Sequence, residues 1–219
     1  MSRNQPVSVI VPFRSLHNGK TRLARVLDDV HREALNHGML RHVVATSLSV
    51  RPEVSVLVVS PDQEALDIMR QLDESILTVL QSPLLPGLNP ALEQATQVAT
   101  GAGSTTVVVL PADLPLIRAS DIENLIRRDA PVVVAPDRHR LGTNALMQRL
   151  DATRGEFRYQ FGQDSYWKHM EESHRLGLDA ATAVSLGVSF DLDTPDDLLE
   201  LGERRVAEVS QIEEAVRCG

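Results

Sequence analysis

The sequence of 219 residues contains few aromatic residues, one cysteine and no long apolar run. Because aromatic residues make up only 3% of the chain, we expect an aliphatic core of Val, Leu, Ile and Ala. The single cysteine, Cys218, excludes a disulfide within the chain and favours the reducing cytoplasm as its location. No apolar run approaches the roughly 18–20 residues of a membrane-spanning helix, and no segment has the pattern of a signal peptide. We therefore expect a cytoplasmic protein with no membrane partner.

An excess of basic residues is also absent, because the formal net charge is −8 at pH 7. This charge argues against a nucleic-acid partner, which normally requires a basic surface. Two common phosphate-binding patterns, the GxxxxGK[ST] loop and GxGxxG, do not occur either. With 42% hydrophobic and 24% charged residues, the composition is ordinary for a globular protein, and the length suits one α/β domain spanning residues 1–219.

The run Thr105–Leu110 is β-branched and apolar without polar alternation, which is typical of a strand buried on both faces of a parallel sheet. It leads to Asp113, and the run Ala183–Phe190, which we also expect to be a strand, leads to Asp191 and Asp193. Carboxylates at strand ends lie where open α/β sheets bind ligands, and they are the donors that Mg²⁺ prefers. The alternative is that these aspartates cap turns and the last helix or lie on the surface. As a set, they favour a metal site.

Apolar runs alternate with helical patterns along most of the chain. The expected strands are Val7–Phe13, Val54–Val59, Ile76–Leu80, Thr105–Leu110, Pro131–Ala135 and Ala183–Phe190. The expected helices are 29–48, 62–72, 89–99, 121–128, 165–177 and 195–209. This alternation predicts an α/β fold, a three-layer sandwich with a mostly parallel sheet and right-handed crossovers.

The loop after the first expected strand, Arg14–Arg22, gathers cations and hydroxyl groups around the Asn18-Gly19 turn. Its candidate nucleotide-binding residues are Arg14, Ser15, Lys20 and Arg22. Cations and backbone N–H groups just before a helix are suited to the phosphates of a nucleoside triphosphate. The alternative is an ordinary solvated basic loop.

A Pro/Gly-rich loop, Gln81–Asn89, follows the third expected strand. Asn89 precedes Pro90, so we expect Asn89 to cap the next helix. A functional role for the loop would be recognition of a nucleotide base by its backbone groups and by the Asn89 amide.

A second phosphate site is suggested by Pro136–Leu146, where Arg138 and its neighbours precede Gly142-Thr143-Asn144. Further on, Ser165 stands at an expected helix start, where free N–H groups can bind phosphate. Between them, residues 151–164 lose periodicity and carry several aromatic residues, which suggests a lid or insertion. On the following helix, we expect His169 and His174 to lie on the surface.

The ordered motifs PFRSLHNGKTRLA, LPADLPL, APDRHRLGTNAL, FGQDS and FDLDTPDDL resemble the CofC/FbiD guanylyltransferases of deazaflavin coenzyme biosynthesis, from about Val9 to Leu199. The resemblance implies a GT-A-type nucleotidyltransferase fold. It also implies transfer of GMP from GTP to a small phosphorylated acid (2-phospho-L-lactate, phosphoenolpyruvate or 3-phosphoglycerate), with release of pyrophosphate. The attacking phosphate is already ionised, so the implied in-line reaction needs no strong general base.

The resemblance also assigns roles to residues at matching motif positions. Mg²⁺ would be held by Asp113, Asp191 and Asp193. The GTP phosphates would meet Lys20 and Arg22, which with Asp113 would be the catalytic residues. The phosphate of the acceptor acid would be held by Thr143, Gly162 and Ser165. Asn89, in GLNPAL, would lie near the nucleotide, and Arg14 stands where the family commonly has Lys, which replaces a point charge with a bidentate fork.

Two alternatives remain from the sequence. One is another enzyme of the same fold, of the molybdopterin or sugar-phosphate type, although these usually carry a Gly-rich loop that SLHNGKTRLA does not match. The other is a non-catalytic GTP-binding module. The oligomeric state is open, and pairing of two chains through the last helix is one expectation.

Overall fold

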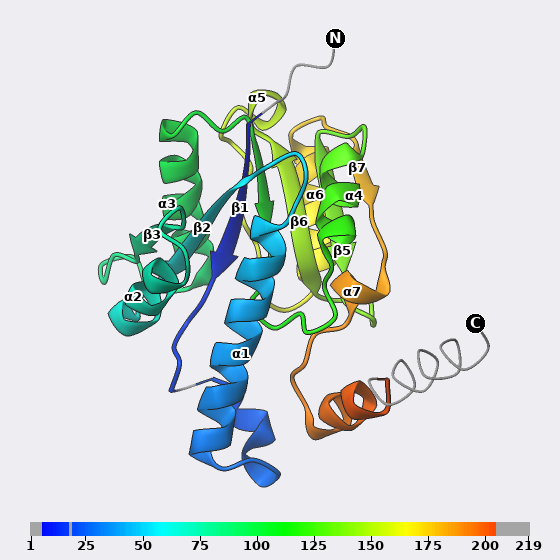
Figure 1. Ribbon diagram of the computed structural model, residues 1–219. Coiled ribbons are helices and arrows are strands. Elements are labelled where there is room, and N and C mark those ends of the chain that lie inside the picture. Colours follow the sequence, from blue (N-terminus) through cyan, green and yellow to red (C-terminus); the bar gives the residue numbers. More distant parts are fainter. Residues whose placement is uncertain (1–5, 18, 205–219) are drawn as a thin grey trace, which may run out of the picture.

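Seven strands form a single sheet, in the order β3-β2-β1-β4-β6-β5-β7, in the computed structural model, which describes residues 6–17 and 19–204 (Figure 1). The strands are β1 (Val7–Pro12), β2 (Ser55–Ser60), β3 (Leu77–Leu80), β4 (Thr106–Val109), β5 (Val132–Pro136), β6 (Thr143–Arg149) and β7 (Ala180–Thr182). The pairs β1–β2, β2–β3, β1–β4 and β5–β7 are parallel, whereas β6 is antiparallel to both of its neighbours, β4 and β5. The mostly parallel sheet that the alternation predicted is confirmed.

Helices cover both faces of this sheet (Figure 1). They are η1 (Thr21–Arg25), α1 (Asp29–Leu48), α2 (Gln63–Leu72), α3 (Leu88–Gly101), α4 (Ala119–Arg127), α5 (Leu150–Thr153), α6 (Ser165–Arg175) and α7 (Leu186–Ser189). A last helix runs over residues 195–204, and the remainder of the predicted helix 195–209 lies outside the described residues, as does Cys218. Buried side chains of α1, α2, α4 and α7 pack on one face of the sheet, and those of α3 and α6 pack on the other, which gives three layers.

The strands nearest the middle of the sheet contain the buried aliphatic runs seen in the sequence. All four residues of β4 are buried, and Val9, Ile10 and Val11 of β1 have no exposed surface. A strand that contacts helices on both faces buries every side chain, so it shows an unbroken apolar run. A smaller cluster, of Leu23, Met39, Phe190, Leu192 and Leu201, joins η1, α1 and the last helix near the carboxyl ends of the strands.

The strand β6 is absent from the sequence-based interpretation, which took Pro136–Leu146 as a loop. Its polar residues Thr143, Asn144 and Gln148 interrupt the apolar pattern, although all three are buried. Each has a hydrogen-bond partner in another segment, between 11 and 47 residues away, which is how a central strand can contain buried polar groups. The predicted loop therefore ends at Gly142.

The predicted strand Ala183–Phe190 is also wrong. The strand lies earlier, at β7, and the segment instead forms the short helix α7, whose cap Ser185 accepts a hydrogen bond from Val188 N at 3.3 Å. At Gly187 an added Cβ would lie 2.8 Å from the carbonyl oxygen of Leu116, so the backbone approaches its neighbour too closely for any larger residue. The alternation of apolar residues in this segment comes from a tight turn packed on the sheet.

The segment 154–164 follows α5 and runs across the face of the sheet that carries α3. Phe157 and Tyr159 are buried in the same cluster as Ala91 and Leu92 of α3, so this part of the segment belongs to the core. Whether residues 151–164 also act as a lid stays a prediction.

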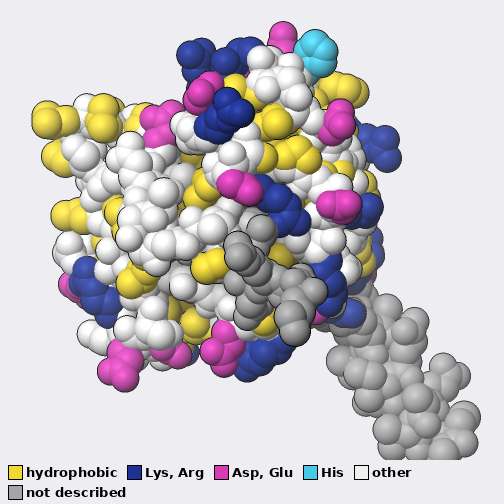
Figure 2. All heavy atoms as spheres, turned by 90° about the horizontal axis from the view of Figure 1, so that it is seen from above, with side chains coloured by type: hydrophobic (Ala, Val, Ile, Leu, Met, Phe, Trp, Pro, Cys, Tyr) yellow, Lys and Arg dark blue, Asp and Glu magenta, His cyan; other side chains and the backbone are white. Residues whose placement is uncertain are grey.

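Figure 2 views the molecule from the end at which β1 begins, opposite the carboxyl ends of the parallel strands. On this face, Lys and Arg side chains are interspersed with Asp and Glu side chains (Figure 2). Within the described part of the chain, no helix combines the length and apolarity needed to cross a membrane.

A buried hydroxyl in the segment 154–164 provides a test of the packing. The Tyr159 hydroxyl lies 2.7 Å from Thr96 Oγ1 and accepts a hydrogen bond from the buried Gln148 Nε2 at 2.8 Å. We expect Y159F to lower the free energy of unfolding by about 1–3 kcal/mol, because it leaves a buried donor unpaired. Urea unfolding measures the loss. The control Y166F, whose hydroxyl meets only the part-buried Thr182, should cost less, and equal losses would contradict the interpretation.

Candidate functional site

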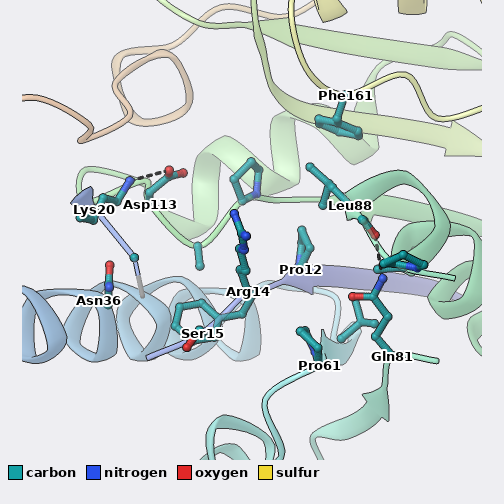
Figure 3. A pocket seen from close by; sticks show the side chains of 18 of the residues that line it. Pro12, Arg14, Ser15, Lys20, Asn36, Pro61, Gln81, Leu88, Asp113 and Phe161 are labelled. Carbon is teal, nitrogen blue, oxygen red and sulfur yellow. Dashed lines mark hydrogen bonds and ion pairs between the residues drawn. The ribbon is translucent and has the colours of Figure 1, made fainter. Parts of the chain in front are cut away.

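A pocket of about 960 Å³ opens at the carboxyl ends of β1–β4 (Figure 3). Its walls come mainly from the loops that follow these strands, with Phe161 and Asp193 added from later segments. The volume lies within the range of small-molecule sites, and the location is where open α/β sheets bind ligands. The fold therefore brings the predicted nucleotide loop and the acidic segments into one cavity.

Lys20 links the two acidic segments. Its Nζ donates to Asp113 Oδ2 at 2.7 Å and to Asp193 Oδ1 at 2.6 Å, and only 10% of its side chain is exposed. Burial lowers the pKa of Lys20, but the two carboxylates outweigh that effect, so its pKa is raised above the ordinary value and the amine stays charged. Lys20 also has a φ of 54°, a left-handed conformation that non-glycine residues rarely adopt. The motifs assign Lys20 to phosphates and the aspartates to Mg²⁺, and the direct pairing of the two is a finding of the structure.

Asp191 completes a group of three carboxylates. Its Oδ1 accepts a hydrogen bond from Asn144 Nδ2 at 3.2 Å, which fixes it beside β6. Burial, and to a smaller extent the charges of Asp113 and Asp193, raise the pKa of the Asp191 carboxyl. Asp191 thus lies in the same acidic cluster as the two carboxylates that Lys20 binds.

The donor chemistry of these carboxylates fits a hard divalent cation such as Mg²⁺, which prefers oxygen ligands. Within the residues that the structure describes, however, no group of His, Cys, Asp and Glu side chains is arranged around a common metal position. The ammonium of Lys20 lies between Asp113 and Asp193 and supplies the positive charge there. The metal site thus stays a prediction.

The remaining predicted nucleotide-binding residues of the loop also reach the pocket. Arg14 points into its centre (Figure 3) and makes no hydrogen bond or ion pair with any described residue. Ser15 lines the wall, and Arg22, whose side chain is 73% exposed, lies 3.7 Å from Asp193 Oδ2. Two cations are therefore available to a ligand without first breaking a strong ion pair.

A residue that the sequence did not reveal, Asn36 of α1, positions this loop. Its Nδ2 donates to the carbonyl oxygen of Leu16 at 3.2 Å. At Gly19 an added Cβ would lie 2.2 Å from the same nitrogen, so the close approach requires glycine there. The side chain of Asn36 is buried, so one amide on α1 anchors the loop after β1.

The three predicted acceptor-binding residues gather near the start of α6, outside the wall of the pocket. Ser165 N donates to the Gly162 carbonyl at 3.2 Å, and Thr143 Oγ1 lies 3.0 Å from Nδ1 of His169 on the next helical turn. Thr143 is followed directly by Asn144, which binds Asp191, so this cluster adjoins the carboxylates. Thr143 therefore lies beside α6, the helix that begins at Ser165, and the role of the three residues in binding an acceptor stays a prediction.

His169 is completely buried, which corrects the expectation that it lies on the surface. Its Nε2 accepts from the backbone N–H of Gln160 at 3.0 Å, so the proton of the neutral ring is on Nδ1 and is donated to Thr143 Oγ1. Burial lowers the pKa of His169 to about 4, which keeps this tautomer neutral at pH 7. The hydroxyl proton of Thr143 is then free to point toward an anion.

Asn89 does not cap α3, because the helix begins at Leu88 and Gly87 occupies the cap position. Instead its amide forms two hydrogen bonds with the backbone of Phe161, accepting from N at 2.8 Å and donating to O at 3.2 Å. Phe161 lines the pocket and Asn89 does not, so Asn89 acts on the pocket through Phe161. The role of Asn89 therefore depends on a contact with a residue 72 positions away, which the local sequence pattern of a helix cap does not indicate.

Arg138, which the sequence placed in a phosphate-binding loop, is engaged elsewhere. Its guanidinium donates to the Asp191 carbonyl at 2.8 Å and to Asp197 Oδ1 at 2.8 Å, and it stacks over Phe190 at 4.4 Å. Asp197 in turn accepts from the backbone N–H groups of Asp193 and Thr194. Arg138 therefore holds the acidic segment in place and is not available to a phosphate.

The chain is similar to known proteins over nearly all of the residues that the structure describes. The model of the family described as "Guanylyl transferase CofC like" matches residues 7–204. A phosphoenolpyruvate guanylyltransferase from Rubrobacter xylanophilus is 38% identical over 198 residues, which cover 89% of this chain and 93% of that protein. A 2-phospho-L-lactate guanylyltransferase from Methanothrix thermoacetophila is 34% identical over 197 residues, covering 90% of this chain and 83% of that protein.

Solved structures show the likeness of the fold. One from Desulfovibrio desulfuricans, assigned to the nucleotide-diphospho-sugar transferases, aligns with a TM-score of 0.71 at 16% identity and covers 88% of this chain and 84% of that one. At this level of identity the likeness concerns the fold alone, and the predicted nucleotidyltransferase fold is confirmed.

The burial of His169 predicts a pH dependence of stability. In the unfolded chain the imidazole has a pKa of about 6.5, against about 4 when folded, so protonation favours unfolding and stability falls as the pH drops through this window. Between pH 7 and pH 5 the loss should be about 2 kcal/mol. H169Q should lack this contribution. Urea unfolding at both pH values measures the difference, and parallel losses in wild type and variant would contradict the assignment.

Proposed function

Because the chain belongs to the family of CofC-like guanylyl transferases, we propose that it transfers GMP from GTP to a small phosphorylated carboxylic acid and releases pyrophosphate. The observation that carries this proposal is that the family match over residues 7–204 includes every residue of the site described above. Relatives named for two acids, phosphoenolpyruvate and 2-phospho-L-lactate, match at 38% and 34% identity. The acid is therefore one of this class, in the biosynthesis of a deazaflavin coenzyme.

The charges of the pocket orient the nucleotide. Its triphosphate lies against Lys20, Arg22 and Arg14, where backbone N–H groups and cations meet. When phosphate oxygens arrive, Arg14 forms its bonds without losing any partner, since none of the described residues binds it. Arg14 can also bind two phosphate oxygens with the planar fork of its guanidinium, a fixed geometry that the point charge of a lysine does not provide.

The acceptor phosphate lies at Thr143, Gly162 and Ser165. Thr143 donates its hydroxyl proton to the phosphate because His169 already fills its acceptor position. The start of α6 adds the positive end of a helix dipole, while the N–H groups of Ser165 and Tyr166 already donate to Gly162 O and Leu141 O. The adjoining carboxylates repel the acid, so a cation is needed between them.

In the reaction, an oxygen of the acceptor phosphate attacks the α-phosphorus of GTP. A new O–P bond forms, the bond from the α-phosphorus to the oxygen bridging to the β-phosphate breaks, and pyrophosphate leaves with that electron pair. The nucleophile is ionised at pH 7, so the chain needs no general base, and the neutral, buried His169 serves to orient Thr143. Lys20 and Arg22 are positive charges held in position, and they stabilise the negative charge on the transferring and leaving groups.

Asp113, Asp191 and Asp193 would hold Mg²⁺, which when bound neutralises phosphate charge. Lys20 would then exchange its carboxylate partners for phosphate oxygens, which are anionic like the carboxylates that raise its pKa in this structure. A cytoplasmic location, the absence of nucleic-acid and membrane partners, and pairing of two chains through the last helix remain our further expectations.

The reaction is tested by measuring pyrophosphate release from GTP with Mg²⁺ present. The acceptors are phosphoenolpyruvate, 2-phospho-L-lactate and 3-phosphoglycerate, with a blank that contains no acid and with CTP in place of GTP. We expect release that requires both GTP and one of the acids. If GTP binds but no acid supports release, the chain is a GTP-binding module or uses another acceptor, and the proposal is wrong.

Removal of the Lys20 charge should abolish most of the activity. We expect K20M to lower kcat/KM by at least about 100-fold, because the transferring phosphate loses its buried cation. The matched control is R25M, which removes one positive charge at an exposed position outside the pocket, at the end of the short helix η1 that Lys20 precedes. Activity of K20M within threefold of R25M would exclude Lys20 from the reaction.

A further inference from the structure

The end of the pocket away from Lys20 is apolar. Figure 3 shows Lys20 and Asp113 at one end, Gln81 and Leu88 at the other, and Arg14 between them. Apolar lining residues come from the ends of β2 and β3 and from the loop that begins at Gln81, and they include Val59, Pro61, Leu80, Pro83, Pro86 and Leu88. Apolar walls suit the faces of a heteroaromatic ring, so under the proposed function the base of the nucleotide lies here while its phosphates lie at the cations.

Gln81 is a polar side chain of this end whose orientation is fixed. Its backbone N–H donates to Ser60 O at 2.9 Å, which extends the pairing of β3 with β2 and anchors the residue. Its Nε2 donates to the carbonyl oxygens of Leu85 and Gly87, both at 2.8 Å. Rotation of the amide by 180° would turn Oε1 toward these two acceptors, so only one orientation is stable.

This orientation leaves the other half of the amide free. Figure 3 shows the carbonyl oxygen of Gln81 on the pocket side and the nitrogen toward the loop. Oε1 has no hydrogen-bond partner among the described residues, although Gln81 is only 8% exposed. The pocket thus presents a fixed acceptor and no amide donor at this point, and a ligand can reach the oxygen, because Oε1 is not one of the buried side-chain atoms without a partner.

We propose that Gln81 Oε1 accepts a hydrogen bond from the Watson–Crick edge of guanine and thereby selects GTP over ATP. Guanine carries two adjacent donors on this edge, N1–H and the 2-amino group. Adenine has an acceptor, N1, at the corresponding place, so two lone pairs would face each other. Because the amide cannot turn over to offer a donor, the mismatch is not relieved, and a site of this kind discriminates strongly.

The test measures equilibrium binding of GTP and of ATP by calorimetry, without acceptor acid. In wild type we expect a clear preference for GTP, and in Q81M a preference at least about tenfold smaller, mainly because GTP binds more weakly. The matched control is Q94M. Gln94 braces the same loop from outside the pocket, accepting from Ser82 N at 3.0 Å and donating to Leu80 O at 3.0 Å. Damage to the loop alone weakens both nucleotides together and leaves the ratio as it was.

A second arm needs no variant. Wild type should bind 1-methylguanosine triphosphate, which has no N1 proton, at least about tenfold more weakly than GTP. An unchanged GTP-to-ATP ratio in Q81M, or equal binding of GTP and its 1-methyl derivative, would overturn the assignment. Both arms are independent of catalysis, so they can fail while pyrophosphate release succeeds, and the reverse also holds.

Discussion

The charge balance between Lys20 and the carboxylates of Asp113 and Asp193 is the interaction on which the rest of the site depends. It joins the loop after β1, the end of β4 and the segment before the last helix, which lie up to 173 residues apart in the chain. Without the ammonium, three neighbouring carboxylates would repel one another in partly buried surroundings. Under the proposed function, this ammonium would move to phosphate oxygens once a bound cation took its place beside the carboxylates.

Neighbouring residues fix the position of the acidic segment, of Asp113 and of Thr143. Arg138 holds the acidic segment through the Asp191 carbonyl and through Asp197, while Leu192 N donates to the Asp113 carbonyl at 3.1 Å. On the acceptor side, a neutral buried His169 orients one hydroxyl. These supports are neutral or internally paired, so they add no free charge to the pocket. The charges that remain available there, above all Arg14, are those that a triphosphate would use.

Much of this could be predicted from the sequence, and the failures share one cause. Unbroken apolar runs located β1 and β4, and the polar residues directly after them located Lys20 and Asp113, because a parallel sheet gathers its carboxyl ends. Local patterns failed where a distant contact decided the outcome. The polar residues of β6 are paired across the fold, Asn89 binds Phe161 where a cap was expected, and Gly187 permits a close backbone approach. The loop Gln81–Asn89 was expected to recognise a base, but the Gln81 and Asn36 side chains were not singled out, since their roles depend on which carbonyl oxygens the fold brings near them.

The measurement that tests the central claim most directly is the NMR signal of the Lys20 ammonium. Lys20 and Lys168 are the only lysines in the chain, so selective ¹⁵N labelling gives two side-chain signals, one of which is an internal reference. Titration with GTP and Mg²⁺ should shift the Lys20 signal and leave that of Lys168 in place, because Lys20 passes from two carboxylates to phosphate oxygens. If the Lys20 signal stays unchanged while GTP saturates the protein, the nucleotide does not meet this lysine, and the account of the site is wrong.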